Sequence, residues 1–182
     1  TLGSNTTGTN NVAVGGGALH SNTTASDNTA MGYRALKANT TGATNVAVGK
    51  SALDANTTGD NNSALGSNAL GGLTTGSNNV AVGEQTVHVA TTVNNTTGLG
   101  TQALWSLTTG NENTAVGRIS MLYTTTGYEN TALGYYSLRT NTTGSKNTAL
   151  GVFAMGSNTT ADFNTAVGYN SLYANTTGAQ NT

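Results

Sequence analysis

The chain has 182 residues, no Cys, no Pro and a formal net charge of −1. Without Cys, a disulfide framework and thiol chemistry are excluded, and without a basic cluster no nucleic-acid partner is expected. No apolar run approaches the roughly 18 residues that a membrane span requires, so membrane insertion is not expected either.

One glycine recurs every 17 residues along the whole chain. A fixed short period is the signature of a solenoid, in which each repeat forms one coil stacked on its neighbours. We therefore expect an all-β fold, a parallel β-solenoid (β-roll) of about 10.7 coils, because 182 residues are divided into repeats of 17. Residues 1–182 are expected to form a single domain, uncapped at both ends, as a segment of a longer chain or of a polymer. The glycines of this register are Gly15, Gly32, Gly49, Gly66, Gly83, Gly100, Gly117, Gly134, Gly151 and Gly168.

Each repeat predicts two short strands and two corners. The segment before the register glycine, such as residues 11–14, contains the Thr and Val that favour strands. The glycine itself predicts a sharp corner that needs a positive φ or close backbone packing. The following segment, such as residues 35–41, predicts a return strand, and the Gly that usually follows its Thr-Thr pair predicts the second corner.

Two apolar columns predict the core of the coil. One lies directly before the register glycine and contains Val14 and Leu65; the other lies four residues after it and contains Leu19 and Leu36. The position two before the glycine is almost always Ala, which allows two interpretations. It is either a tight contact inside the coil or a second buried face against another chain.

Polar columns predict stacked ladders. The Asn four residues before the register glycine, such as Asn45 and Asn62, is expected to form an amide ladder along the rod. Of each Thr-Thr pair, one residue is expected to face inward and one outward. Residues 86–98 depart from the consensus, with Val93 at the usual second Gly position. Their spacing is unchanged, so we expect the coil to survive with a distorted corner.

Few residues could support chemistry. His20 and His88 occupy the same position four coils apart, which is nearly 20 Å at about 4.8 Å per coil, too far for a shared metal. Glu112 and Glu129 stack in adjacent coils, and Lys146 continues their column, which predicts a charge ladder rather than a catalytic pair. We expect no enzyme activity, no catalytic or metal site and no cofactor.

The variable columns contain the candidate recognition residues. Aromatic side chains collect there in the second half of the chain, where they could stack on sugars or pack on a neighbouring filament element. The candidate recognition or packing aromatics are Trp105, Tyr135, Tyr136, Phe153, Tyr169 and Tyr173. The repeat also creates N-x-S/T sequons, and the candidate glycosylation sites are Asn5, Asn22, Asn39, Asn56, Asn141, Asn158 and Asn175.

The motif Asn-Val-Ala-Val-Gly at residues 11–15 and 45–49 resembles the head repeats of trimeric autotransporter adhesins. The longer unit at residues 164–178 is similar to repeats in bacterial surface proteins and phage-type tail fibres. The resemblance covers the whole chain and implies a left-handed parallel β-roll that forms trimers, with no catalytic residues.

These observations together predict an extracellular or cell-surface protein that acts as a structural or adhesive fibre: an adhesin, a stalk or a tail-fibre segment. Its expected partners are copies of itself, with glycans or a cell surface as further candidates. The alternative is the protomer of a self-assembling extracellular filament, with or without glycosylation, that stacks end to end. A more distant alternative is an ice-binding protein, which the Thr columns suggest.

Overall fold

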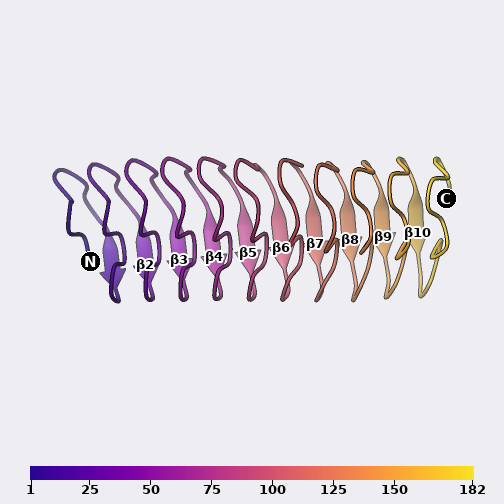
Figure 1. Ribbon diagram of the computed structural model, residues 1–182, viewed down its shortest axis with the longest axis horizontal. Coiled ribbons are helices and arrows are strands. Elements are labelled where there is room, and N and C mark those ends of the chain that lie inside the picture. Colours follow the sequence, from indigo (N-terminus) through magenta and orange to yellow (C-terminus); the bar gives the residue numbers. More distant parts are fainter.

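The computed structural model describes residues 1–182 and contains ten three-residue strands and no helix. The strands form one parallel sheet in chain order, and each residue pairs with the residue 17 positions later, as Ala13 does with Ala30. Figure 1 shows the resulting row of stacked coils. The predicted parallel β-solenoid with a 17-residue coil is therefore confirmed. The strands are β1 (Val12–Val14), β2 (Thr29–Met31), β3 (Val46–Val48), β4 (Ser63–Leu65), β5 (Val80–Val82), β6 (Thr97–Leu99), β7 (Thr114–Val116), β8 (Thr131–Leu133), β9 (Thr148–Leu150) and β10 (Thr165–Val167).

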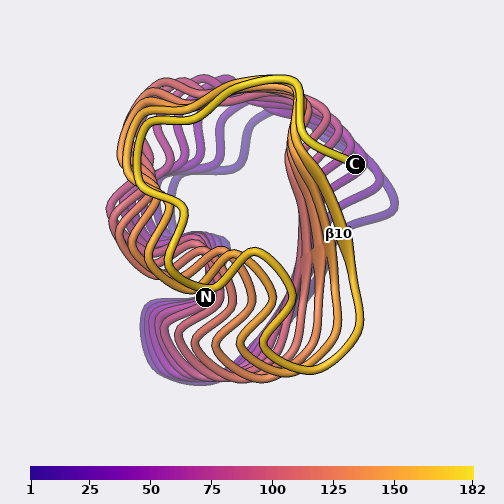
Figure 2. The same cartoon turned by 90° about the vertical axis from the view of Figure 1, so that its right-hand side faces the viewer.

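The coils wind in a left-handed sense. Figure 2 looks along the rod from the C-terminal end. The chain descends through β10 on the right, crosses the bottom, rises on the left and returns over the top. This path turns clockwise as it approaches the viewer, which is the left-handed direction. The handedness that the resemblance implied is therefore the one observed.

The predicted return strand at residues 35–41 is not a strand. It consists of turns and bends, because Arg34 and Leu36 adopt φ values of +60° and +50°, which interrupt an extended chain. Neighbouring coils nevertheless bond here in parallel, since the Thr40 N–H donates to the Thr57 carbonyl at 3.0 Å. Of 117 backbone hydrogen bonds, 99 lie outside the strands, so stacking of the turns contributes most of the bonding between coils.

The interior of each coil is lined by the Ala and Leu columns. Ala30, Ala47, Leu36 and Leu53 are fully buried, whereas the apolar residues directly before the register glycine face outward. The prediction that the column directly before the register glycine forms part of the core is wrong. Successive residues of a strand face opposite sides, and the inward position of each strand is the central Ala.

The narrow interior explains why that central residue is Ala. Gly98 is the exception, and a Cβ added there would meet the Thr86 and Val87 side chains at 2.6 and 2.9 Å. Opposite β6, Thr86 replaces the Ala of most coils and Val87 branches at Cβ, so both bring methyl groups close to the strand, where Gly98 lacks one. The Ala column is therefore a tight contact inside the coil, the first of the two interpretations.

Two asparagine ladders run through the interior. The predicted ladder is confirmed: the Asn45 amide donates to Asn28 Oδ1 at 3.2 Å and to the Gly59 carbonyl at 2.8 Å. Asn45 Oδ1 in turn accepts the backbone N–H of Asn62 at 2.9 Å. These bonds satisfy buried polar groups that would otherwise each cost about 1–3 kcal/mol.

The second ladder was not predicted. It contains the sequon residues Asn22, Asn39 and Asn56, whose amides donate from each coil to the preceding one. The ladder stops at Leu73, which occupies the next position and is fully buried. Asn56 Oδ1 consequently has no donor. The fold thus tolerates a leucine in this column at the cost of one unpaired oxygen.

The irregular coil at residues 86–98 stays in register but differs locally. Val93 at the second corner offers its carbonyl to the Asn79 amide at 2.8 Å, as glycine carbonyls do in other coils. The distortion lies just before this corner. The Thr91 and Thr92 N–H groups make no bond to the Thr108 carbonyl, whereas those of Thr74 and Thr75 bond to the Thr91 carbonyl at 2.8 and 3.4 Å.

Both predicted reasons hold at the register glycines of the interior coils, whereas at Gly168 only the positive φ applies, because nothing lies within 4 Å of an added Cβ. Gly66 has φ +138°, and a Cβ there would lie 2.5 Å from the Gly83 carbonyl oxygen. We expect Gly66→Ala to lower the stability by about 3 kcal/mol or more, from backbone strain and the backbone clash. Gly16 is exposed, lacks a positive φ and has 3.4 Å of space beside Tyr33. Gly16→Ala should therefore change stability by less than about 0.5 kcal/mol in thermal or urea unfolding followed by circular dichroism.

The two ladders should differ in tolerance. Asn45→Leu removes an amide that bonds both neighbouring coils, and we expect a loss of about 3 kcal/mol or more. Asn39→Leu places at that position the residue that the same column has at Leu73 and Leu107, and we expect a loss nearer 1 kcal/mol. Urea unfolding of the two variants measures the difference. Equal losses would contradict the distinction.

Candidate functional site

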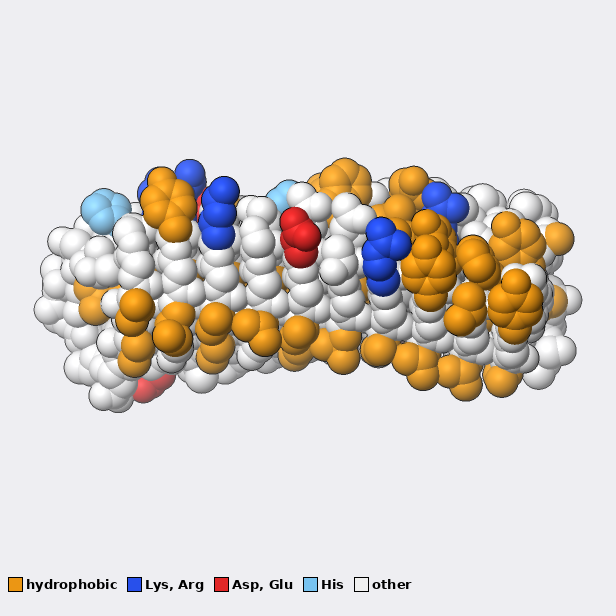
Figure 3. Space-filling model, turned by 90° about the horizontal axis from the view of Figure 1, so that it is seen from below, with side chains coloured by type: hydrophobic (Ala, Val, Ile, Leu, Met, Phe, Trp, Pro, Cys, Tyr) orange, Lys and Arg blue, Asp and Glu red, His pale blue; other side chains and the backbone are white.

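The outward face of the sheet carries a row of exposed apolar side chains. The third residue of each strand points outward, and Val14, Leu65 and Val167 are 54%, 51% and 66% exposed. Figure 3 shows this row as a hydrophobic band running the length of the rod. The first residue of each strand also points outward and is Val, Thr or Ser. A contiguous apolar band on a monomer indicates an interaction surface.

The second surface is an aromatic cluster at the corner that follows β8, β9 and β10. The structure brings together five of the predicted aromatics, Tyr135, Tyr136, Phe153, Tyr169 and Tyr173, which we call the aromatic platform. The sixth, Trp105, lies apart and stacks on His88 with ring centroids 6.5 Å apart.

The rings of the platform enclose a hollow. Tyr136 and Phe153 stack with centroids 5.3 Å apart and an interplanar angle of 19°. Tyr169 and Tyr173 stand nearly perpendicular to Phe153, at 86° and 81°. A hollow of about 280 Å³ is lined by Phe153, Tyr169, Asn170 and Tyr173. An open hollow with three aromatic walls and one amide suits a ring-shaped polar ligand.

Two arginines extend the platform. The Arg139 guanidinium lies 4.8 Å from the centre of the Tyr136 ring and 5.5 Å from that of Tyr123. Arg118 lies 5.9 Å from the centre of the Tyr135 ring. Sequence analysis missed Tyr123, which occupies another column, and both arginines, which share the columns of Tyr135 and Tyr173 but are not aromatic. The signal that could have found them is the arrival of Arg and Tyr at neighbouring positions one coil apart.

The Tyr135 ring packs edge-on against Tyr136, with ring centroids 4.2 Å apart, and its hydroxyl accepts a hydrogen bond from Arg118 Nη1 at 3.4 Å. Hydrogen bonding with Tyr136 is the main cause that raises the pKa of Tyr135 above its ordinary value, and desolvation adds to it. Near neutral pH the Tyr135 hydroxyl therefore keeps its proton and remains a hydrogen-bond donor.

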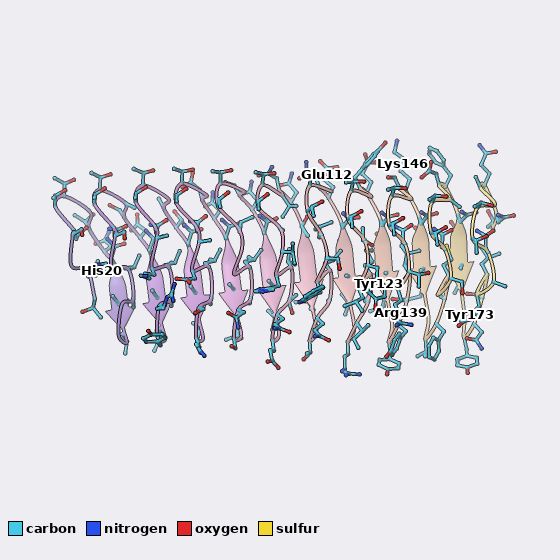
Figure 4. The ribbon with its side chains drawn as sticks, viewed as in Figure 1. His20, Glu112, Tyr123, Arg139, Lys146 and Tyr173 are labelled. Atoms are coloured by element: carbon cyan, nitrogen blue, oxygen red, sulfur yellow. The ribbon has the colours of Figure 1, made fainter.

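The charged residues on the opposite side do not form the expected ladder. Figure 4 places Glu112 and Lys146 at the other end of the coil from Tyr123, Arg139 and Tyr173. Lys146 forms no ion pair with Glu129; its amino group lies over the Tyr128 and Phe163 rings, 5.8 and 5.4 Å from their centres. The prediction of a charge ladder is wrong, because the aromatic rings on both sides attract the ammonium group.

The remaining titratable residues form no reactive cluster. Glu112 and Glu129 line a polar hollow of about 250 Å³ together with Tyr128. No group of three or more His, Cys, Asp or Glu side chains could hold a metal ion, and the one ion pair joins Arg34 to Asp54 at 2.9 Å. His20 is exposed and His88 is half-buried.

Most candidate glycosylation sites lie inside the coil. The amide nitrogen that would carry an N-linked glycan is already a hydrogen-bond donor in each, as in Asn39, which donates to the Gly42 carbonyl at 2.8 Å. In the folded chain these amide nitrogens are therefore not accessible to a modifying enzyme. The fully buried sites are Asn22, Asn39, Asn56, Asn141 and Asn158, whereas Asn5 is exposed and Asn175 half-buried.

The Thr pairs do not form a flat surface. Thr57 is half-buried and its hydroxyl donates to the Thr74 carbonyl at 3.0 Å, while Thr58 is exposed. The expected outward row exists, but the inward row lies at the edge of the coil and not in its core. Both rows run along bends outside the sheet, so the pairs lack the flat strand geometry on which an ice-binding surface was considered.

Comparison with known proteins identifies no relative. No protein-family model, curated protein or solved structure matches the chain. The structure contains no helix that is long and apolar enough to cross a membrane.

Burial of the sequon residues gives a testable consequence. We expect peptides containing Asn22, Asn39, Asn56, Asn141 and Asn158 from protein purified from its native source to have unmodified masses. Peptide mass spectrometry measures this directly. A glycan on Asn39 or Asn56 would contradict the buried placement, since the ladder has no room for a sugar on its amide nitrogen.

Proposed function

We propose that the chain is a segment of a non-enzymatic extracellular or cell-surface fibre that is structural or adhesive and associates with copies of itself. The observation that carries the proposal is the exposed apolar band on β1–β10. Most of the remaining surface is polar, and the apolar band faces water along the entire rod. The unfavourable free energy of exposing these apolar side chains to water is removed if neighbouring rods pack with their bands against each other.

The geometry suits association between identical rods. The band repeats at about 4.8 Å per coil, so the side chains of one rod can interdigitate with those of another that has the same repeat. Residues such as Leu65 and Val82 would each contribute roughly 1.5–3 kcal/mol when fully buried. The resemblance to trimeric adhesin heads favours three chains around a common axis, with the corners outside.

A second candidate is a filament that grows end to end. Most coils bond their neighbours with the same set of backbone groups, as the Thr40–Thr57 and Thr57–Thr74 bonds illustrate. The C-terminal end of one rod can therefore hydrogen-bond to the N-terminal end of another in the way that neighbouring coils do. Negative-stain imaging separates the candidates, because lateral association gives bundles of defined length whereas axial stacking gives fibres of unlimited length.

Lateral association is tested by placing charge in the band. We expect the 182-residue chain to form an oligomer, and Leu65→Lys with Val82→Lys to weaken association by about 100-fold or more, because two unpaired ammonium groups would be buried. Analytical ultracentrifugation measures the change. Thr58→Lys with Thr75→Lys adds the same charge at exposed bends of the same region and should leave association unchanged. A monomeric parent chain, or equal loss in both variants, would refute the proposal.

A further inference from the structure

The aromatic platform is not needed to build the solenoid. The column that contains Tyr135 and Tyr169 contains Lys50, Ser67 and Glu84 in earlier coils, which fold in the same way. Tyr135, which has further coils on both sides, is 38% exposed. Large aromatic side chains that are dispensable for the fold and remain in water indicate a contact with something outside the chain.

A glycine positions one ring of the platform. Gly156 occupies a column that contains Lys37, Trp105 or Arg139 in other coils, and Gly3 and Gly71 lie in the same column against the His20 and His88 rings. A Cβ at Gly156 would lie 2.7 Å from the Tyr173 ring. The glycine therefore lets the Tyr173 ring rest against the backbone of the preceding coil, which fixes one wall of the hollow.

The charged side chains at the platform, Arg118 and Arg139, are both positive. Arg118 and Arg139 both lie over tyrosine rings, and neither forms an ion pair, since the one ion pair in the chain is Arg34–Asp54. Glu112 lies at the opposite end of the coil (Figure 4), and the acidic residue of the Tyr135 column, Glu84, lies two coils before Arg118. A ligand that carries negative charge would be attracted to this surface.

We propose that the aromatic platform binds an acidic oligosaccharide, with one pyranose ring seated in the hollow over Phe153 between Tyr169 and Tyr173 and a carboxylate directed to Arg139. Pyranose rings present apolar C–H faces that pack on aromatic rings, while the Asn170 amide can donate to and accept from ring hydroxyls. Arg139 and Tyr173 lie two coils apart along the chain, about 10 Å at the spacing of stacked strands. A saccharide of a few units lying along the rod can therefore reach both.

This inference extends the adhesive part of the proposed function, but it uses a different surface from the apolar band. The two can therefore fail separately. Binding is measured on the parent chain and on the Leu65→Lys, Val82→Lys chain. Equal binding by both chains is expected, because neither substitution touches the platform.

The test is calorimetric titration with a tetrasaccharide of galacturonic acid and, separately, with the neutral cellotetraose. We expect the acidic saccharide to bind more tightly, and its affinity to fall as salt is raised. Tyr173→Ala should weaken it by about tenfold through loss of a stacking wall. Arg139→Gln should remove the preference for the acidic over the neutral saccharide.

The matched control is Tyr128→Ala, which removes an exposed tyrosine that also contacts a cation, Lys146, in the opposite part of the coil. It should leave the affinity unchanged. Circular dichroism verifies that each variant keeps the fold of the parent. Absence of binding, equal affinity for the two saccharides, or an equal loss in Tyr128→Ala would each overturn the proposal.

Discussion

Every coil of this protein depends on bonds to the coil beside it. Backbone amides and carbonyls pair between positions 17 residues apart, both in the sheet and in the turns. A single coil has no second layer to satisfy its polar groups, so the stacked neighbour supplies the partners. Because buried polar groups must be hydrogen-bonded, the period cannot change by even one residue without breaking a row of bonds.

The thin cross-section follows from this stacking. Between the sheet and the facing turns there is space for one row of Leu-sized side chains, two rows of small residues that are mostly Ala, and the asparagine amides. Gly98 opposite Val87 shows how little volume is free. The buried asparagines help to hold the coils together, since their amides form hydrogen bonds between neighbouring coils inside the rod. The apolar residues that do not fit inside are left on the outward face of the strands.

This arrangement separates architecture from recognition. The columns that close the coil are nearly constant, whereas the positions after the register glycine tolerate Gly16, Lys50, Glu84 or Tyr135 alike. A cluster such as the aromatic platform can therefore change without cost to the fold. The constant columns produce the outward apolar band, and for that reason the band extends over all ten strands while the platform is confined to the last three.

The period and the amide ladder through Asn45 could be predicted, because both repeat in the sequence itself. The sequence alone could not predict where the ladders lie relative to the core. From the sequence alone, either Val14 or Ala13 could face the interior, because the direction in which the chain turns at the corner is not known. The positive φ of Leu36 could not be predicted either, because leucine rarely adopts it. Asn39 has the sequence of a glycosylation site, yet its amide lies inside the coil.

The sequence by itself determined that this chain is a parallel solenoid with one coil per 17 residues, because only stacked identical coils require so strict a repeat. Only the tertiary structure decided which side of each strand faces inward. That choice depends on how the turns fold back over the three-residue strands and on how little space they leave there. The same choice determined that Ala is buried, that Val and Leu face outward, and that Tyr136, Phe153 and Tyr173 meet at one corner.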